Sequence, residues 1–193
     1  MRIGVLALQG DFVRHVQALV RCHLDIQVVE VRKAEQLDEI DGLIIPGGES
    51  TTLLRLMEDW GFVPALEKFH GAGRPIFGTC AGAIVLAREV EHPRQFSLGF
   101  IDIAVERNAY GRQRESFVAS GQAALEGEPA PLEMVFIRAP RIRQVGPGVT
   151  ILARHGEEPV LVRQGNVLAG TFHPELTDDP AVHRYFWQMV HGE

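Results

Sequence analysis

The segment PIFGTCAGAIVLAREV, residues 75–90, decides how this chain folds. Its first part, Pro75–Gly78, is a short apolar run typical of a buried strand, and its last part, Ala83–Val90, favours an apolar helix. Between them stands Cys80 in Gly-Thr-Cys-Ala-Gly, a glycine-flanked nucleophile at a strand-to-helix turn. The flanking residues must be small because strand and helix come close together there. The helix N-terminus favours a thiolate, and the N–H of Ala81 points to where an oxyanion would develop.

The residues before this segment alternate between strand and helix patterns. Strands are predicted over Arg2–Leu8, Ile26–Val31 and Gly42–Ile45, and helices over 12–22, Thr52–Trp60 and Val63–Phe69. In the second of these helices, Trp60 is expected on one apolar stripe with Leu53, Leu56 and Met57. Strands that alternate with helices favour βαβ units, and therefore a mostly parallel sheet with helices on both faces.

The second half of the chain shows strands with few helices between them. The predicted strands are Gly99–Glu106, Glu133–Arg138, Val149–Ala153, Val160–Arg163 and Val167–Thr171, and the chain closes with a helix over Ala181–Val190. We expect these strands to form an antiparallel or mixed extension of the same sheet. Residues 1–193 are thus predicted to be one α/β domain.

Composition excludes several functional classes. The 193 residues are 46% hydrophobic and 23% charged, with a net charge of −6, which argues against disorder and against a general nucleic-acid binder. No apolar run approaches the roughly 20 residues of a membrane helix, and no signal-peptide pattern is present, so we expect no membrane contact and a reduced, cytoplasmic protein. Two cysteines make no disulfide framework, and no Cys/His grouping has metal-ligand spacing. Because Gly-Lys-Ser/Thr and G-x-G-x-x-G motifs are also absent, no cofactor is expected.

His173 is the best candidate for the base that activates the thiol. It follows the apolar run Val167–Phe172, and the carboxyl ends of strands form the edge where open α/β sheets carry their sites. Pro174 stiffens the segment, so that Glu175 can be held beside the imidazole and orient it. The remaining histidines are expected to be surface or hydrogen-bonded structural residues: His15, His23, His70, His92, His155, His183 and His191.

Two further features suit a ligand that carries a carboxylate. Pro46–Thr51 (PGGEST) closes a predicted strand, and its glycines leave backbone N–H groups free, so Gly48 could supply a second oxyanion donor. Ser50 or Thr51 could cap the following helix. Arg107 follows one predicted strand and Arg138 ends the next, and a guanidinium can hold a carboxylate with two hydrogen bonds.

These segments resemble a known family. Thr79-Cys80-Ala81-Gly82 followed by His173-Pro174-Glu175 is similar to the class I, triad-type glutamine amidotransferases. A finer resemblance, to the glutaminase subunits of two-component pyridoxal 5′-phosphate synthases, rests on GVLALQG (4–10), PGGEST (46–51), GTCAG (78–82), RNAYGRQ (107–113), FIRAP (136–140) and FHPEL (172–176). The motifs span nearly the whole chain.

The resemblance implies a fold, an activity and a partner. The fold is a single flavodoxin-like α/β/α domain, and the activity is hydrolysis of L-glutamine through a cysteinyl thioester. The partner is a (β/α)₈-barrel synthase subunit that takes the ammonia, and twelve copies of each subunit can assemble. The glutaminase of that family is weak or silent alone. Gln9 is expected near the oxyanion loop at the partner interface.

The resemblance also implies roles for individual residues. Cys80 is the nucleophile, His173 the general base and acid, and Glu175 the residue that orients His173. The oxyanion donors are Gly48 and Ala81. The residues expected to bind glutamine are Gly48, Glu49, Ser50, Arg107, Ile137 and Arg138.

Two other functions remain open from the residues alone. A cysteine peptidase or related hydrolase on the same scaffold would also use a cysteine at the turn and a histidine. A non-enzymatic regulatory subunit could keep the fold without the chemistry, although the intact set of Cys80, His173 and Glu175 speaks against it.

Overall fold

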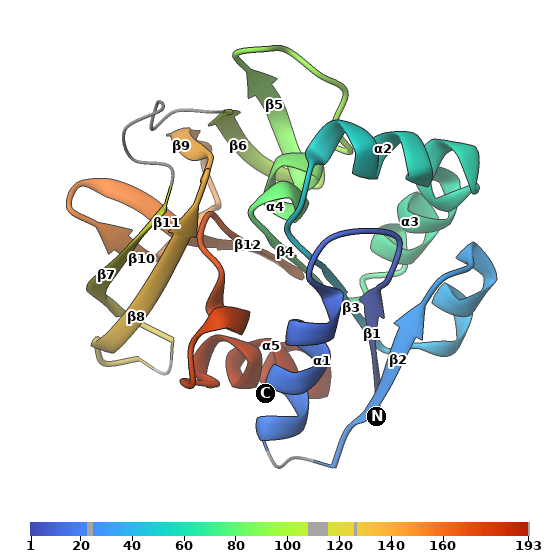
Figure 1. Cartoon of the computed structure of the whole chain (residues 1–193), viewed down its shortest axis with the longest axis horizontal. Helices are drawn as coiled ribbons and strands as arrows, with labels where there is room; N and C mark the ends of the chain where they lie inside the picture. Colours follow the sequence, from blue (N-terminus) through green and yellow to red (C-terminus); the bar gives the residue numbers. More distant parts are fainter. Residues whose placement is uncertain (23–24, 108–115, 126, 193) are drawn as a thin grey trace.

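The fold is built around a nine-stranded sheet with the order β2-β1-β3-β4-β12-β11-β10-β7-β8. The computed structural model describes residues 1–22, 25–107, 116–125 and 127–192 (Figure 1). Five neighbouring strands are parallel: β1 (Arg2–Leu6), β2 (Gln27–Val31), β3 (Gly42–Ile45), β4 (Ile76–Thr79) and β12 (Val167–Gly170). The predicted parallel sheet is therefore confirmed, and its fourth and fifth strands come from segments about ninety positions apart.

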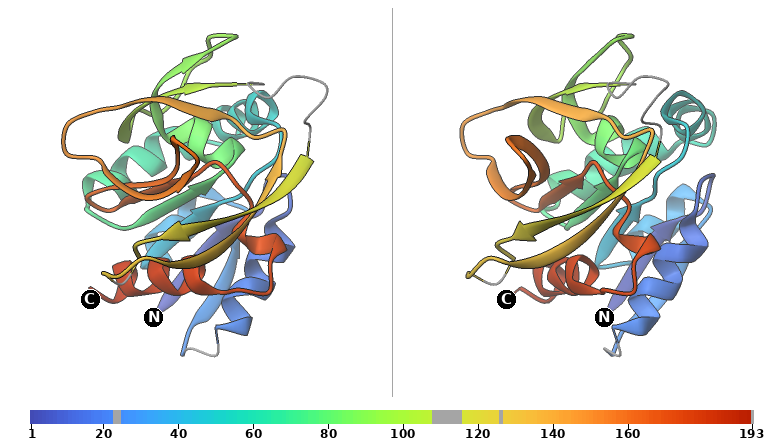
Figure 2. Two further views of the ribbon diagram at one scale, coloured as in Figure 1. Left: turned by 90° about the vertical axis from the view of Figure 1, so that its left-hand side faces the viewer. Right: turned by 60° about the vertical axis from the view of Figure 1, so that its left-hand side comes forward.

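The rest of the sheet is antiparallel, as the second half of the sequence predicts. Its strands are β11 (Glu158–Gln164), β10 (Thr150–His155), β7 (Ser116–Ala123) and β8 (Ala130–Ile137). The β7–β8 hairpin forms one outer edge of the sheet and faces the viewer in the left view of Figure 2. It carries the end of β8 to the neighbourhood of His173, whose N–H donates to the carbonyl of Val135 at 2.8 Å.

Helices cover both faces of the parallel strands (Figure 1). The helical segments are α1 (Phe12–Arg21), η1 (Ala34–Glu39), α2 (Ser50–Asp59), α3 (Phe62–Gly71), α4 (Ala81–Leu86), η2 (Pro174–Leu176) and α5 (Ala181–His191). Successive strand residues point to opposite faces, so Ile44 packs in the core under α1 and α5, whereas Leu43 and Ile45 pack under α2, α3 and α4. Strands buried on both faces explain the continuous apolar runs of the sequence.

The helix predicted over Ala83–Val90 is wrong in its second half. Helix α4 ends at Leu86, and β5 (Ala87–Glu91) begins at once with Ala87 in extended backbone. Strand β5 pairs in parallel with β6 (Ile101–Glu106), and β6 pairs with β9 (Arg141–Val145). Long-range pairing with β6 therefore overrides the helical pattern of this stretch.

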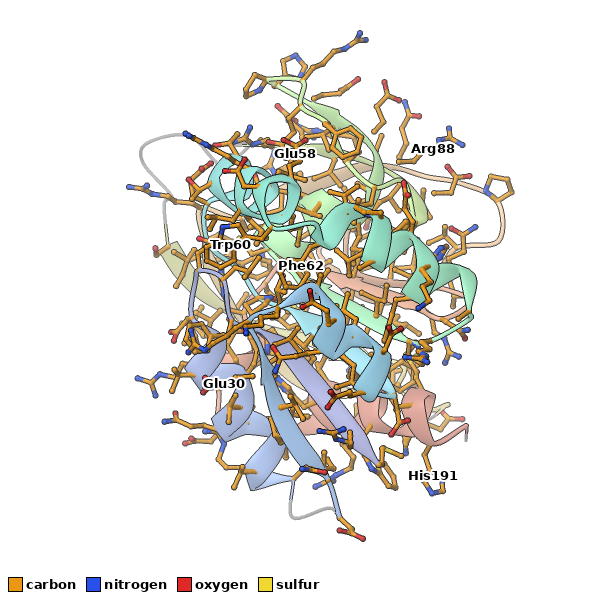
Figure 3. All side chains as sticks on the ribbon, turned by 90° about the vertical axis from the view of Figure 1, so that its right-hand side faces the viewer. Glu30, Glu58, Trp60, Phe62, Arg88 and His191 are labelled. Atoms are coloured by element: carbon orange, nitrogen blue, oxygen red, sulfur yellow. The ribbon has the colours of Figure 1, made fainter. Side chains whose placement is uncertain are left out.

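Two other expectations need correction. Strand β6, predicted in the main sheet, belongs to a separate three-stranded sheet with β5 and β9. Trp60, expected on the apolar stripe of this helix, follows the end of α2 and stays 54% exposed, while Phe62 is fully buried (both labelled in Figure 3). Within the described residues, none of the helices has both the length and the apolar character needed to cross a lipid bilayer.

Candidate active site

The candidate site lies where three neighbouring parallel strands end. Strands β3, β4 and β12 are adjacent in the sheet, and Gly47, Cys80 and His173 follow their carboxyl ends. This is the edge at which open α/β sheets bind their ligands. The topology thus brings together residues that are far apart in the sequence.

Cys80 occupies a sharp bend between β4 and α4. Its φ of 49° and ψ of −103° lie in a region that L-residues avoid, at a cost of about 1–3 kcal/mol. A Cβ on Gly78 would lie 2.6 Å from the carbonyl carbon of Gly82, and one on Gly82 would lie 2.1 Å from the oxygen of Ile45. The close approach that requires small flanking residues is therefore present. Ala81 is the first residue of α4, so its N–H has no carbonyl one turn earlier to bond.

His173 and Glu175 form a buried pair at the start of η2. The imidazole Nδ1 lies 2.7 Å from Oε1 of Glu175, and Pro174 between them is the first residue of η2. Nε2 on the other side of the ring has no hydrogen-bond partner within the described part of the chain. That nitrogen therefore remains available to the thiol of Cys80.

The electrostatics of this pair favour charged forms. Burial alone would lower the pKa of His173, but the adjacent sulfur of Cys80 and the carboxylate of Glu175 outweigh it and raise the pKa to about 10. Burial likewise opposes ionisation of Glu175, yet His15 and His173 bring its pKa to about 2. An imidazolium between a cysteine sulfur and a carboxylate is the arrangement that can activate a cysteine nucleophile.

The loop after β3 packs directly over these groups. A Cβ on Gly47 would lie 2.6 Å from Cε1 of His173 and 3.3 Å from Cβ of Cys80, so only glycine fits between them. Gly48 has a φ of +145° and touches the side chain of Gln9, whose Oε1 accepts a hydrogen bond from the N–H of Glu49 at 3.2 Å. Gln9 thus holds the loop that carries Gly48, in agreement with its expected position near this loop.

Glu49, and neither Ser50 nor Thr51, caps α2. Its carboxylate accepts hydrogen bonds from the N–H groups of Thr51 at 3.2 Å and Thr52 at 2.8 Å, and from both threonine hydroxyls. The hydrogen bond from the Thr51 hydroxyl is the main cause that lowers the pKa of Glu49 to about 2, against some burial. The predicted Ser50 or Thr51 cap is therefore wrong, because the longer glutamate reaches the same N–H groups from the residue before the helix.

The other residues expected to bind glutamine surround this loop. Nη2 of Arg107 lies 3.3 Å from Oε1 of Glu49, and the hydroxyl of Ser50 donates to Oε1 of Gln95 at 3.1 Å. The carbonyl of Ile137 lies 3.9 Å from Sγ of Cys80, and Arg138 follows with a φ of 45°. Ile137 thus lies beside the nucleophile and Arg107 beside the loop, whereas 108–113 of the predicted arginine loop fall outside the described residues.

Sequence reasoning missed two residues behind the triad. His15 and His183 are fully buried and adjacent, and His15 reaches Oε2 of Glu175 at 3.4 Å. The only signal was a histidine on an otherwise apolar helix face. Of the other histidines, His23 lies outside the described residues. Cys22 is buried, and its thiol donates to the carbonyl of Ala18, as expected of a packing residue.

Metal-ligating side chains do not cluster in the described part of the chain. Across the described ranges, which omit 23–24, 108–115, 126 and 193, there is no group of three or more His, Cys, Asp or Glu side chains that could hold a metal ion. What the arrangement offers is a nucleophilic thiol, a proton carrier and backbone donors, which together suit acyl transfer.

Comparison with known proteins gives concordant matches over nearly the whole chain. The model of the SNO glutamine amidotransferase family matches residues 5–192. The pyridoxal 5′-phosphate synthase subunit PdxT of Koribacter versatilis is 59% identical over 98% of this chain and 96% of its own length, and that of Thermotoga maritima is 50% identical over 98% and 100%.

Solved structures agree. A crystal structure of a glutamine amidotransferase superposes with a TM-score of 0.89 at 49% identity, and 98% of each chain is covered. A chain of PurLQS from Thermotoga maritima superposes with a TM-score of 0.74 at 16% identity, again over 98% of each chain, which shows a common fold.

Proposed function

The chain belongs to the SNO glutamine amidotransferase family, and from this membership we propose that it is the glutaminase subunit of a pyridoxal 5′-phosphate synthase. It hydrolyses the side-chain amide of L-glutamine and supplies the ammonia to a synthase subunit. The observation that carries the proposal is the positive-φ bend at Cys80 beside the imidazole of His173. Nδ1 of that imidazole is hydrogen-bonded to Oε1 of Glu175 at 2.7 Å.

The first half of the reaction forms a thioester. The thiolate of Cys80 attacks the side-chain carbonyl carbon of glutamine, and the carbonyl electrons move to the oxygen. N–H groups of Ala81 and Gly48 stabilise that oxyanion, each by about 3 kcal/mol when well placed. The imidazolium of His173 then donates its proton to the amide nitrogen, the C–N bond breaks, and ammonia leaves.

The second half releases glutamate. His173, now neutral, takes a proton from a water molecule whose oxygen attacks the thioester carbonyl. The C–S bond breaks, so that the thiolate of Cys80 and the imidazolium of His173 return together, and the product carboxylic acid loses its proton to solvent. Glu175 holds the ring in one orientation and stabilises its charged form through both halves.

Binding of the amino acid end of glutamine needs a cation and an anion. Arg107 suits the α-carboxylate and Glu49 the α-ammonium group, and the two side chains lie 3.3 Å apart beside the loop. Ser50, Ile137 and Arg138 complete the proposed glutamine site, with Gly48 contributing backbone.

The partner reaches the site through the loop that Gln9 holds. We place Gln9 at the interface, because a partner that moves its side chain also moves Glu49 and Gly48, and so completes the oxyanion hole. This accounts for a subunit that is weak or silent alone. The partner is a (β/α)₈ synthase subunit in an assembly of up to twelve copies of each chain, as the family resemblance implies.

The whole chain acts as one glutaminase domain in this proposal, because both cores pack on the one large sheet that carries the site. We propose that the protein works in the cytoplasm, since Cys22 and Cys80 are free thiols and the chemistry requires a reduced Cys80.

Family membership also decides among the functions left open by the residues alone. A peptidase has no support among the matched proteins, whose names describe glutamine amidotransferases and synthase subunits. A non-catalytic subunit is disfavoured by the intact set of Cys80, His173 and Glu175, in which the imidazole and the carboxylate favour their charged forms.

The test mixes the chain with a synthase subunit and measures glutamate and pyridoxal 5′-phosphate formation from glutamine. Wild type should produce both, Cys80→Ala neither, and Cys22→Ala should match wild type because that thiol lies outside the site. Ammonium salt should restore pyridoxal 5′-phosphate formation with Cys80→Ala. Unchanged glutamate formation by Cys80→Ala would refute the proposal.

A further inference from the structure

Two buried histidines take no part in the mechanism described above. His15 on α1 and His183 on α5 are both 0% exposed, and Nδ1 of His15 lies 3.0 Å from Nε2 of His183. Burying two imidazoles costs free energy that aliphatic side chains would not cost. Their position therefore calls for a physical reason.

His15 reaches the triad from behind. Its Nε2 lies 3.1 Å from Oγ1 of Thr79, the residue directly before Cys80, and 3.4 Å from Oε2 of Glu175. The other carboxylate oxygen, Oε1, is hydrogen-bonded to Nδ1 of His173. Oε2 is fully buried and makes no hydrogen bond within the described residues, so the imidazole of His15 is the polar group that faces it.

The partners fix which nitrogen of His15 carries the proton. A carboxylate only accepts hydrogen bonds, so a lone pair on Nε2 facing Glu175 would be repelled, and the proton belongs on Nε2. Nδ1 is then an acceptor, and Nε2 of His183 must donate to it. Burial lowers the pKa of both His15 and His183, which keeps the two rings neutral at pH 7.

We propose that His15 is a positioning residue for Glu175, and that His183 acts through it by fixing its Nε2–H tautomer. The N–H dipole stabilises the buried carboxylate in the orientation that holds His173. This inference rests on the proposed function, because it concerns the same triad. Without the dipole, Glu175 either takes up a proton or turns toward other donors, and His173 loses its anchor.

Other charged groups act on this pair and must be kept constant. Asp11 raises the pKa of His15 and His173 lowers it, while Arg21 lowers the pKa of His183. None of them is changed in the variants below.

The experiment uses three variants in a Cys22→Ala background, so that Cys80 is the only thiol. His15→Leu removes the donor, His15→Gln keeps an amide N–H near the place of Nε2, and Leu19→Ala opens the same core on the same helix without touching the triad. Two quantities are measured: kcat and KM for glutamine with the synthase subunit, and the pH at which iodoacetamide alkylation of the free chain is half-maximal.

His15→Leu should lower kcat about 10- to 100-fold, the range expected when a buried polar group loses the donor that faces it, with KM within about twofold. Its alkylation midpoint should rise by about one pH unit, because a poorly anchored imidazolium stabilises the thiolate less. His15→Gln should recover at least half of each effect. Leu19→Ala should lower the melting temperature without moving the alkylation midpoint.

An unmoved midpoint in His15→Leu, or an equal shift in Leu19→Ala, overturns the inference. If His15→Leu does not fold, His183→Leu replaces it. Its alkylation midpoint should rise by less than one pH unit, and an unchanged midpoint would contradict the inference. The alkylation measurement needs neither glutamine nor the synthase subunit. Absence of glutaminase activity in wild type therefore refutes the proposed function, while the alkylation result alone decides the role of His15.

Discussion

Nδ1 of His173 lies 2.7 Å from Oε1 of Glu175, and the two residues are separated only by Pro174. The short turn makes the proposed base and the carboxylate proposed to orient it one local unit. The proposed nucleophile, Cys80, follows a different strand. Local sequence therefore determines the orientation of the imidazole, and the sheet determines its meeting with the thiol.

Glu175→Gln should keep partial activity, because the amide still contacts the ring but no longer stabilises the imidazolium. We expect kcat to fall about 100-fold, within the range of general acid–base contributions. His173→Asn in the same assay should have no measurable turnover, since the variant loses the imidazole beside the thiol. Exposed Glu157→Gln is the control and should match wild type. If Glu175→Gln were as inactive as Cys80→Ala, Glu175 would do more than orient and stabilise.

His173 should keep its proton well above neutral pH. With a pKa of about 10 against an ordinary 6.5, it contributes stability that is complete below 6.5 and lost as pH rises through 10. Imidazole NMR signals should therefore show His173 protonated at pH 8. In Cys80→Ala one of the groups that raise the pKa is gone, so titration should move toward lower pH. A His173 that titrates near 6.5 in wild type would contradict the charged pair.

Gly47→Ala should damage catalysis more than stability. The added methyl would meet Cε1 of His173 at 2.6 Å and push the imidazole from the thiol, and a displacement of about 1 Å can cost about 100-fold in rate. Gly71→Ala is the matched control, because nothing lies within 4 Å of its Cβ position. Steady-state kinetics and melting temperature on both variants provide the test, and equal kinetics for the two would argue against close packing at Gly47.

Arg107→Ala should raise KM for glutamine about tenfold or more and change kcat much less, if the guanidinium holds the α-carboxylate equally in ground and transition states. Arg88→Ala removes a cation paired with Asp102 on another part of the surface and should leave both constants unchanged (Figure 3). A fall in kcat at constant KM would reassign Arg107 to the reacting atoms.

Glu49→Ala should lower the free energy of unfolding by about 1 kcal/mol, the usual worth of a helix cap. Because the pKa of Glu49 is depressed to about 2, its contribution is present above its ordinary pKa and is lost as pH falls through 2. Urea unfolding at pH 7 and pH 3 should therefore show a larger difference from wild type at pH 7. Glu58→Ala, in the last turn of α2, is the control.

Much of the site could be predicted because its determinants are local. Glycines around Cys80 specify the bend, and the run Val167–Phe172 places His173 at the end of a strand. The Glu49 cap was missed because serine and threonine are the more usual capping residues at such a turn. The contact between His15 and Glu175 joins residues 160 positions apart, and no spacing rule encodes it.

Physical reasons also explain why the sequence did not predict strands β7 and β5. Strand β7 alternates half-buried and exposed residues and contains Ser116, Ser120 and Gly121, so it lacks the apolar signature of a core strand. Strand β5 follows α4 without a turn residue, and only its pairing with β6 distinguishes it from a continuing helix. Tertiary pairing, and not local propensity, decides both segments.

The place of β12 between β4 and β11 has a consequence for biosynthesis. As the chain leaves the ribosome, Cys80 emerges long before Val167–His173, so the nascent protein carries its sulfur without the imidazole that ionises it. The strand that fills the gap in the sheet also delivers the base. A chain that ends before β12 therefore lacks the proposed base, and we expect it to release no ammonia from glutamine.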